Sequence, residues 1–209
     1  MTDLTMTTDP QTVPAPAGAT TTARRAMIDS QLRTSGVNEE YVLARMLAVP
    51  REDFLPADKA ALAYIDRAVS LGDAGHLAAP LFYGKLLMEA APARTDRVLV
   101  VDGGTRYLAE LIRPLVAEVV TISPADAAAG AATGEFSLIV IDGAIEQFPD
   151  ALAACLAEDG RVASGLVLRQ VTRLAAGRKV AGKIALQPVE DLGIPVLHAF
   201  DAPKSWTFA

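Results

Sequence analysis

Four apolar runs in the second half of the chain constrain the fold most strongly. Each is short enough for one strand, and a turn or a helix-like segment such as 107–116 or 149–157 follows the first three. The runs are VLVV (98–101), EVVTIS (118–123), FSLIVID (136–142) and GRVASGLVL (160–168). Unbroken apolar runs are typical of parallel strands that are covered on both faces. The alternation predicts a doubly wound α/β sheet, with weaker strands at KIALQPV and VLHAF near the end.

The first half of the chain is predicted to be helical. ARRAMIDSQLRTSG clusters its apolar residues on one side and stops at Gly36. A second helix is expected after an Asn38 cap, with Leu47 on its apolar face, and a third over 80–91. Residues 1–22 show no apolar period and are expected to be a flexible tail. Residues 23–209 then form a single domain, with a helical part over 23–92 and a sheet part over 93–209.

Composition narrows the classes of function. Of the 209 residues 51% are hydrophobic, and a net charge of −6 argues against a nucleic-acid or polybasic membrane binder. The one cysteine, Cys155, excludes an intramolecular disulfide and is expected in the core, while His76 and His198 leave little for a metal site. No segment has the length of a transmembrane helix, and the N-terminus lacks a signal-peptide pattern. We therefore expect a cytoplasmic protein without metal.

Ordered motifs in the first half point to a known family. They are Gln31-Leu32-Arg33, Gly36-Val37, VPREDFLP (49–56) and AYIDRAVSLG (63–72). The set resembles the signatures of the protein-L-isoaspartate O-methyltransferase family, and the resemblance resumes in VLVVDGGTRY, FSLIVIDGA and DGRVA. It implies a Rossmann-like S-adenosylmethionine-dependent methyltransferase fold with a mostly parallel sheet and an N-terminal helical addition. The reaction implied is methyl transfer to isoaspartyl carboxylates in damaged proteins.

The acceptor loop departs from the family pattern. The family has G-x-G-x-T-I-S-x-P, and its Thr and Ser hydroxyls line the acceptor site. When Gly72 and Pro80 fix the alignment, His76 falls on the Thr and Ala78 on the Ser. We expect no intact catalytic residue at these positions. A protonated His76 could bind a carboxylate instead, although a partly exposed loop histidine is the simpler interpretation.

The cofactor turn departs as well. The family has an acid in the strand and then G-x-G-[ST]-G-Y, where this chain has Val100, Asp102 and Arg106 at the acid, first-glycine and third-glycine positions. An arginine in the left-handed conformation costs roughly 1–2 kcal/mol, and its side chain is expected to fill space that the cofactor needs. The candidate cofactor-binding residues are Asp102, Gly103, Gly104, Thr105, Tyr107 and Asp142. Asp142 ends the FSLIVID strand, where a turn or capping role is the alternative.

The family's ribose-binding acid is replaced by Ser123, which Pro124 follows. Hydrogen bonds to charged groups contribute roughly 1.5–3 kcal/mol, so two lost contacts predict affinity weaker by roughly a hundredfold or more. Asp126 in a shifted loop, or Asp102 in place of Val100, would be the substitutes. Residues 123–137 also leave no room for the helix, strand and crossover that the family has here, because one parallel crossover takes about a dozen residues. We expect a reduced sheet in a divergent, shortened member.

Three hypotheses follow from these departures. The preferred one is a pseudoenzyme, a non-catalytic relative that serves binding or assembly and holds no S-adenosylmethionine. The second is an active methyltransferase with unusual replacements. The third is a site for another small anionic ligand near Arg106 and His76. A protein partner is expected in the first case, and a homodimer through the sheet edge that a deleted strand would expose.

Overall fold

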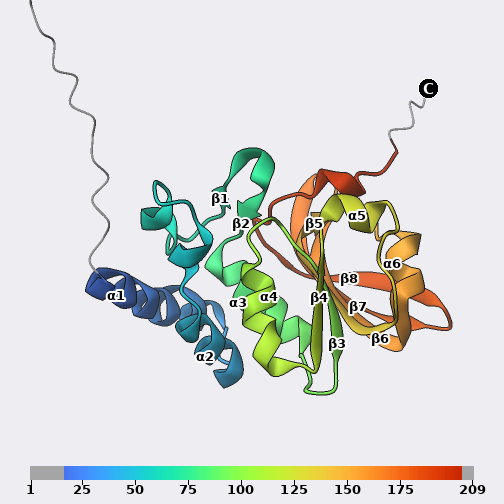
Figure 1. The fold of residues 1–209 in the computed structure, drawn as a ribbon, viewed down its shortest axis with the longest axis horizontal. Coiled ribbons are helices and arrows are strands. Elements are labelled where there is room, and N and C mark those ends of the chain that lie inside the picture. Colours follow the sequence, from blue (N-terminus) through green and yellow to red (C-terminus); the bar gives the residue numbers. More distant parts are fainter. Residues whose placement is uncertain (1–16, 204–209) are drawn as a thin grey trace, which may run out of the picture.

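A computed structural model describes residues 17–203 and shows an α/β fold around one six-stranded sheet. The strand order is β4-β3-β5-β6-β7-β8 (Figure 1). The strands are β3 (Arg97–Val101), β4 (Glu118–Ile122), β5 (Phe136–Ile145), β6 (Leu156–Leu168), β7 (Val171–Val180) and β8 (Lys183–Asp191). The pairs β3–β4, β3–β5 and β5–β6 are parallel, whereas β6–β7 and β7–β8 are antiparallel. The predicted α/β class with a mostly parallel sheet is confirmed.

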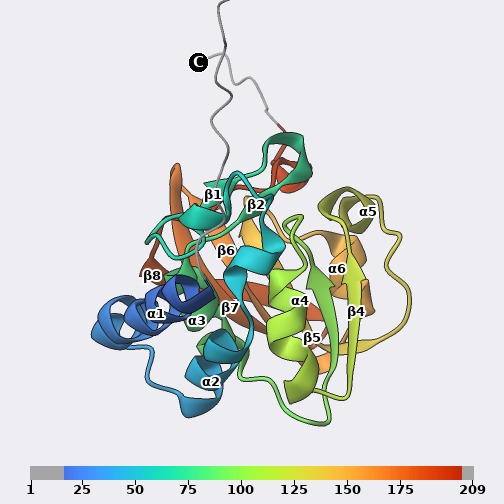
Figure 2. The same ribbon diagram turned by 60° about the vertical axis from the view of Figure 1, so that its left-hand side comes forward.

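Hydrophobic clusters cover both faces of the sheet. Val98 and Val100 of β3 pack into the cluster that contains the N-terminal helices, whereas Leu99 and Val101 pack into the cluster on the other face. Helices α3 (Pro80–Ala90) and α4 (Tyr107–Ile112) lie on the first face, and α5 (Pro124–Ala128) and α6 (Asp150–Cys155) on the second (Figures 1 and 2). Cys155 belongs to the second cluster, as predicted. Two-sided burial explains why β3 has no polar alternation.

The N-terminal part is helical but differs in detail from the prediction. Helix α1 (Ala17–Met27) begins within the predicted tail and continues as irregular turns to Gly36, whose φ of 83° ends it as expected. Helix α2 (Glu40–Ala48) has Glu39 rather than Asn38 at its cap, because the extended backbone conformation persists to Glu39. Leu47 is 43% exposed and lies off the buried face. The predicted tail residues 1–16 lie outside the described residues.

Strand β4 ends the sheet on one side. Within residues 17–203 it pairs only with β3, and α5 is the one helix or strand between β4 and β5. Val119, Val120 and Ile122 are only half-buried, in contrast to the fully covered residues of β3. The short crossover predicted from the spacing is present in the structure.

The C-terminal region differs most from the prediction. Strand β7 was not predicted, because its central Ala175, Ala176 and Gly177 show neither an apolar run nor a clear alternation. VLHAF is not a strand: Val196 makes an isolated bridge to Ala144, and 198–200 form a single 3-10 turn. Pro195 next to this bridge lacks the N–H that a longer ladder would use. No helix in the described part of the chain is long and apolar enough to cross a membrane.

Candidate functional site

A cleft of about 1170 Å³ opens at the carboxyl edge of the sheet. Its lining includes the loop 72–76, most of the turn 102–106 after β3, residues 121–124 at the end of β4, and 193–199 near the C-terminus. Arg113 after α4 also lines it. The loop 72–76 connects the strands of a small two-stranded sheet, β1 (Val69–Ser70) and β2 (His76–Leu77). This small sheet places the loop over the carboxyl ends of the strands of the main sheet (Figure 2). Ligands of open α/β sheets bind in such crevices. The cleft is therefore the candidate binding site.

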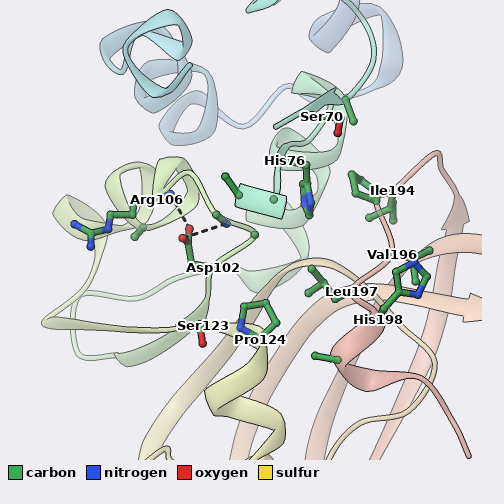
Figure 3. A pocket seen from close by; sticks show the side chains of 18 of the residues that line it. Ser70, His76, Asp102, Arg106, Ser123, Pro124, Ile194, Val196, Leu197 and His198 are labelled. Carbon is green, nitrogen blue, oxygen red and sulfur yellow. Dashed lines mark hydrogen bonds between the residues drawn. The ribbon is translucent and has the colours of Figure 1, made fainter. Parts of the chain in front are cut away.

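Asp102 is bonded to its own turn. Its Oδ1 accepts a hydrogen bond from the Arg106 N–H at 2.7 Å, and its Oδ2 accepts one from the Gly104 N–H at 3.2 Å (Figure 3). Arg106 has a φ of 63°, the left-handed conformation expected for the position of the family's third glycine. The carboxylate therefore holds two N–H groups that would otherwise be free at the start of the following helix.

Arg106 is part of the cleft lining, and its filling of space that a cofactor needs stays a prediction. Its side chain is exposed and points away from His76 and Asp102 in Figure 3. The two cationic groups of the third hypothesis are thus not brought together, and this geometry does not support an anion site between them.

His76 is buried and serves the fold. Its backbone N–H donates to the Gly103 carbonyl at 2.9 Å, and its ring Nε2 lies 3.0 Å from the Asp142 carbonyl oxygen. Because a carbonyl only accepts, Nε2 carries the hydrogen. Burial lowers the pKa of His76, against the opposing influences of Asp142 and Asp102. The partly exposed histidine expected from the sequence is therefore a buried one, 8% exposed, that favours the neutral form.

Ala78, the other aligned acceptor position, is fully buried. Its N–H donates to the Tyr83 hydroxyl at 3.1 Å, and that hydroxyl donates to Asp142 Oδ2 at 3.2 Å. Asp142 is also fully buried, and burial, with the charge of Asp102, raises its pKa to about 7. Sequence reasoning missed Tyr83, although a tyrosine on an apolar helix face needs a partner for its hydroxyl.

Arg51 of the VPREDFLP motif contacts both Ala78 and Tyr83. The side chain is fully buried, donates to the carbonyls of Ala63 at 2.6 Å and Ala78 at 2.7 Å, and lies 5.0 Å from the ring centroid of Tyr107. Sequence reasoning did not predict its burial. Tyr107 is buried as well, and neither it nor Asp142 lines the cleft.

The ribose position has no free carboxylate. Ser123 caps α5: its Oγ accepts from the Asp126 N–H at 3.1 Å and donates to Asp126 Oδ2 at 2.8 Å. Asp126 is exposed and not part of the cleft lining. The wall at 193–199 was also missed, since no motif marks it. In the described chain no group of three or more His, Cys, Asp or Glu side chains is placed to hold a metal.

The sheet and the helices on its two faces have the Rossmann-like methyltransferase fold. A solved structure of a putative protein-L-isoaspartate O-methyltransferase from Plasmodium falciparum, in complex with S-adenosyl-L-homocysteine, superposes with a TM-score of 0.68 at 16% identity. The superposition covers 85% of this chain and 97% of that one. A second solved protein-L-isoaspartate O-methyltransferase matches with a TM-score of 0.65, over 83% of this chain and 65% of its own. At 16% sequence identity, the likeness to these two solved structures shows the fold alone.

Sequence comparison supplies the family. The model of the protein-L-isoaspartate(D-aspartate) O-methyltransferase family matches residues 22–126. A protein-L-isoaspartate O-methyltransferase from Koribacter versatilis is 32% identical over 193 residues, or 80% of this chain and 87% of the relative. One from Roseiflexus castenholzii is 36% identical over 112 residues, or 54% of this chain and 51% of the relative. The chain belongs to the protein-L-isoaspartate O-methyltransferase family.

Proposed function

We propose that this chain is a non-catalytic member of its family, a pseudoenzyme whose site serves binding or assembly rather than methyl transfer. The observation that carries the proposal is the Asp102 carboxylate, which bonds the N–H groups of Gly104 and Arg106. A cofactor that approached this turn would meet a negative charge and two donors that already have a partner. The turn keeps its shape through its own side chain.

The residues at the acceptor and ribose positions support the same proposal. At the acceptor position Ala78 has no hydroxyl, and His76 favours the neutral form and donates to Asp142, so neither offers a charge or a hydroxyl to an acceptor carboxylate. At the ribose position the Asp126 carboxylate bonds the Ser123 hydroxyl. The residues present therefore do not fit S-adenosylmethionine, and we derive no methyl-transfer step for this chain.

The alternative is an active methyltransferase, and a specific observation favours it. The cleft of about 1170 Å³ persists at the edge where the fold would hold a cofactor, and a relative at 32% identity is named for the activity. An activated methyl donor needs little beyond a protein that holds donor and acceptor in line. A shift of the turn that moved Asp102 off its amides would be required.

Calorimetry distinguishes a non-catalytic member from an active methyltransferase. We expect no heat when S-adenosylmethionine or S-adenosylhomocysteine is titrated into the protein, and micromolar binding would overturn the proposal. Methyl incorporation into an isoaspartyl peptide, with the Koribacter versatilis relative as positive control, is the second assay. Turnover by this chain would establish the alternative.

A gain-of-binding variant sharpens the test. Replacing Asp102 and Arg106 together by glycine frees the turn amides and removes the left-handed side chain. We expect this double variant to give a measurable heat with S-adenosylhomocysteine under the conditions in which the parent gives none. The matched control is Arg113→Gly, which changes an exposed arginine of the same cleft.

Self-association is part of the proposal. Strand β4 pairs on one side only among residues 17–203, and an unpaired edge can accept a strand from a second copy. We expect a homodimer in sedimentation analysis over a concentration series, whereas a monomer throughout would remove this part. The cytoplasmic location stays a prediction that cell fractionation tests.

A further inference from the structure

The loop 72–76 and the turn 102–106 touch each other through their backbones. The His76 N–H donates to the Gly103 carbonyl at 2.9 Å. A Cβ on Gly75 would lie 2.0 Å from the Gly103 oxygen, and one on Gly104 would lie 2.0 Å from the Ala74 oxygen. Both glycines have positive φ, of 107° and 114°. This contact, which no larger residue would allow, joins two walls of the cleft.

Asp142 lies beneath both of these segments. Its carbonyl oxygen is 3.0 Å from His76 Nε2 on one side, and a Cβ on Gly103 would meet the same oxygen at 2.7 Å on the other. Its carboxyl Oδ2 accepts from Tyr83, whereas Oδ1 has no hydrogen-bond partner within the described chain and lies 3.9 Å from His76 Nε2. A fully buried carboxyl with one bare oxygen is costly to ionise.

The charges that face Asp142 act in opposite directions. Asp102, on the turn, repels an ionised Asp142. Burial lowers the pKa of His76 on the loop side, so the imidazole favours its own neutral form and supplies no opposing positive charge. The Tyr83 hydroxyl, the Gly103 backbone N–H of the turn and Arg51 favour ionisation. Burial and Asp102 outweigh them, and the pKa of Asp142 is raised to about 7. The opposing influences thus leave the pKa of the Asp142 carboxyl near neutral pH.

We propose that Asp142 is a proton-controlled latch that holds the loop 72–76 against the turn 102–106. The neutral carboxyl lies under the contact without disturbing it. When the proton leaves to bulk water, the buried carboxylate repels Asp102 and requires hydration of its bare oxygen. Both effects separate the turn from the loop and widen the cleft. The latch uses only the chain's own groups, so it holds whether or not a cofactor binds.

Hydrogen exchange and NMR on the full chain test the latch. The Asp142 carboxyl carbon shift and the protection of the His76 amide are followed from about pH 5 to about pH 9, with exchange corrected for its intrinsic pH dependence. We expect the carboxyl to titrate near neutrality and the amide to lose at least about tenfold of its protection with the same midpoint. A carboxyl that stays in one state, or an amide whose protection does not follow it, would overturn the proposal.

Variants assign the effect to Asp142. Asp142→Asn should abolish the pH-dependent step in amide protection, and Asp58→Asn, which changes an exposed carboxylate, should keep it. Tyr83→Phe removes the hydroxyl that stabilises the ionised form, so the midpoint should move to higher pH. This variant keeps the test open if Asp142→Asn does not fold. An unchanged midpoint in Tyr83→Phe would count against the latch.

Discussion

Polar side chains in the N-terminal part bond across the fold, whereas Asp102 and Ser123 at the sheet edge bond within their own turns. Arg24 binds Tyr64 and Glu52, and Arg51 binds the carbonyls of Ala63 and Ala78. At the edge, Asp102 binds Gly104 and Arg106, and Ser123 binds Asp126. The first kind of contact ties distant segments together. The second lets a turn keep its shape without any ligand.

The difference indicates which side chains the fold depends on. Long-range bonds to buried carbonyls cannot be replaced by water when they are removed, but bonds within an exposed turn can. Substitutions in the two regions should therefore differ in size, and the pH dependence should come from the buried acid that lies between them.

The largest effect is expected at Arg51. Arg51→Ala leaves the carbonyls of Ala63 and Ala78 without their donor and opens space beside the rings of Tyr83 and Tyr107. We expect the free energy of unfolding to fall by roughly 3–5 kcal/mol in urea denaturation. The exposed Arg113→Ala, which loses only the pair with Glu110, should change it by less than about 1 kcal/mol. Equal losses of stability in Arg51→Ala and Arg113→Ala would contradict the proposed difference between buried long-range bonds and exposed local ones.

The next effect concerns pH. Since the pKa of Asp142 rises from 3.8 to about 7 on folding, the folded chain binds the extra proton, and this stabilisation is fully present below pH 3.8 and lost as pH rises through about 7. Asp142 should therefore lower stability by roughly 3 kcal/mol between about pH 5 and about pH 8. Asp142→Asn should lack this loss in denaturation series at several pH values. Parallel curves for parent and variant would show that Asp142 does not titrate on folding.

The smallest effect is expected at Arg106. Its φ of 63° strains any residue other than glycine, so Arg106→Gly should raise the free energy of unfolding by about 1 kcal/mol. Thermal denaturation measures it, with Arg113→Gly in the following helical turn as the control that should be destabilising. A loss of stability in Arg106→Gly would mean that the arginine side chain makes contacts that outweigh its strain.

Sequence patterns predicted the framework because burial leaves a mark on composition. Val98–Val101 and Leu138–Ile141 are apolar on both faces, and Gly36 marks a left-handed turn. The left-handed backbone at Arg106 followed from its place in the turn. The partners of Asp102 and the burial of Asp142 and Arg51 were not predictable in this way. They depend on how the loop 72–76, the turn and the N-terminal part meet in space, which no local pattern encodes.

One wall of the cleft has a consequence for how the protein is made. Residues 193–199 close the cleft and are held by the Ala144–Val196 bridge, yet they emerge from the ribosome after every strand of the sheet. A nascent chain can thus pair the strands of the sheet while this side of the cleft is still open, and Ile194, Leu197 and Phe200 complete the two clusters afterwards. The cleft becomes complete only once residues 193–199 are made, so a product stopped before them would have the strands of the sheet but not the finished site.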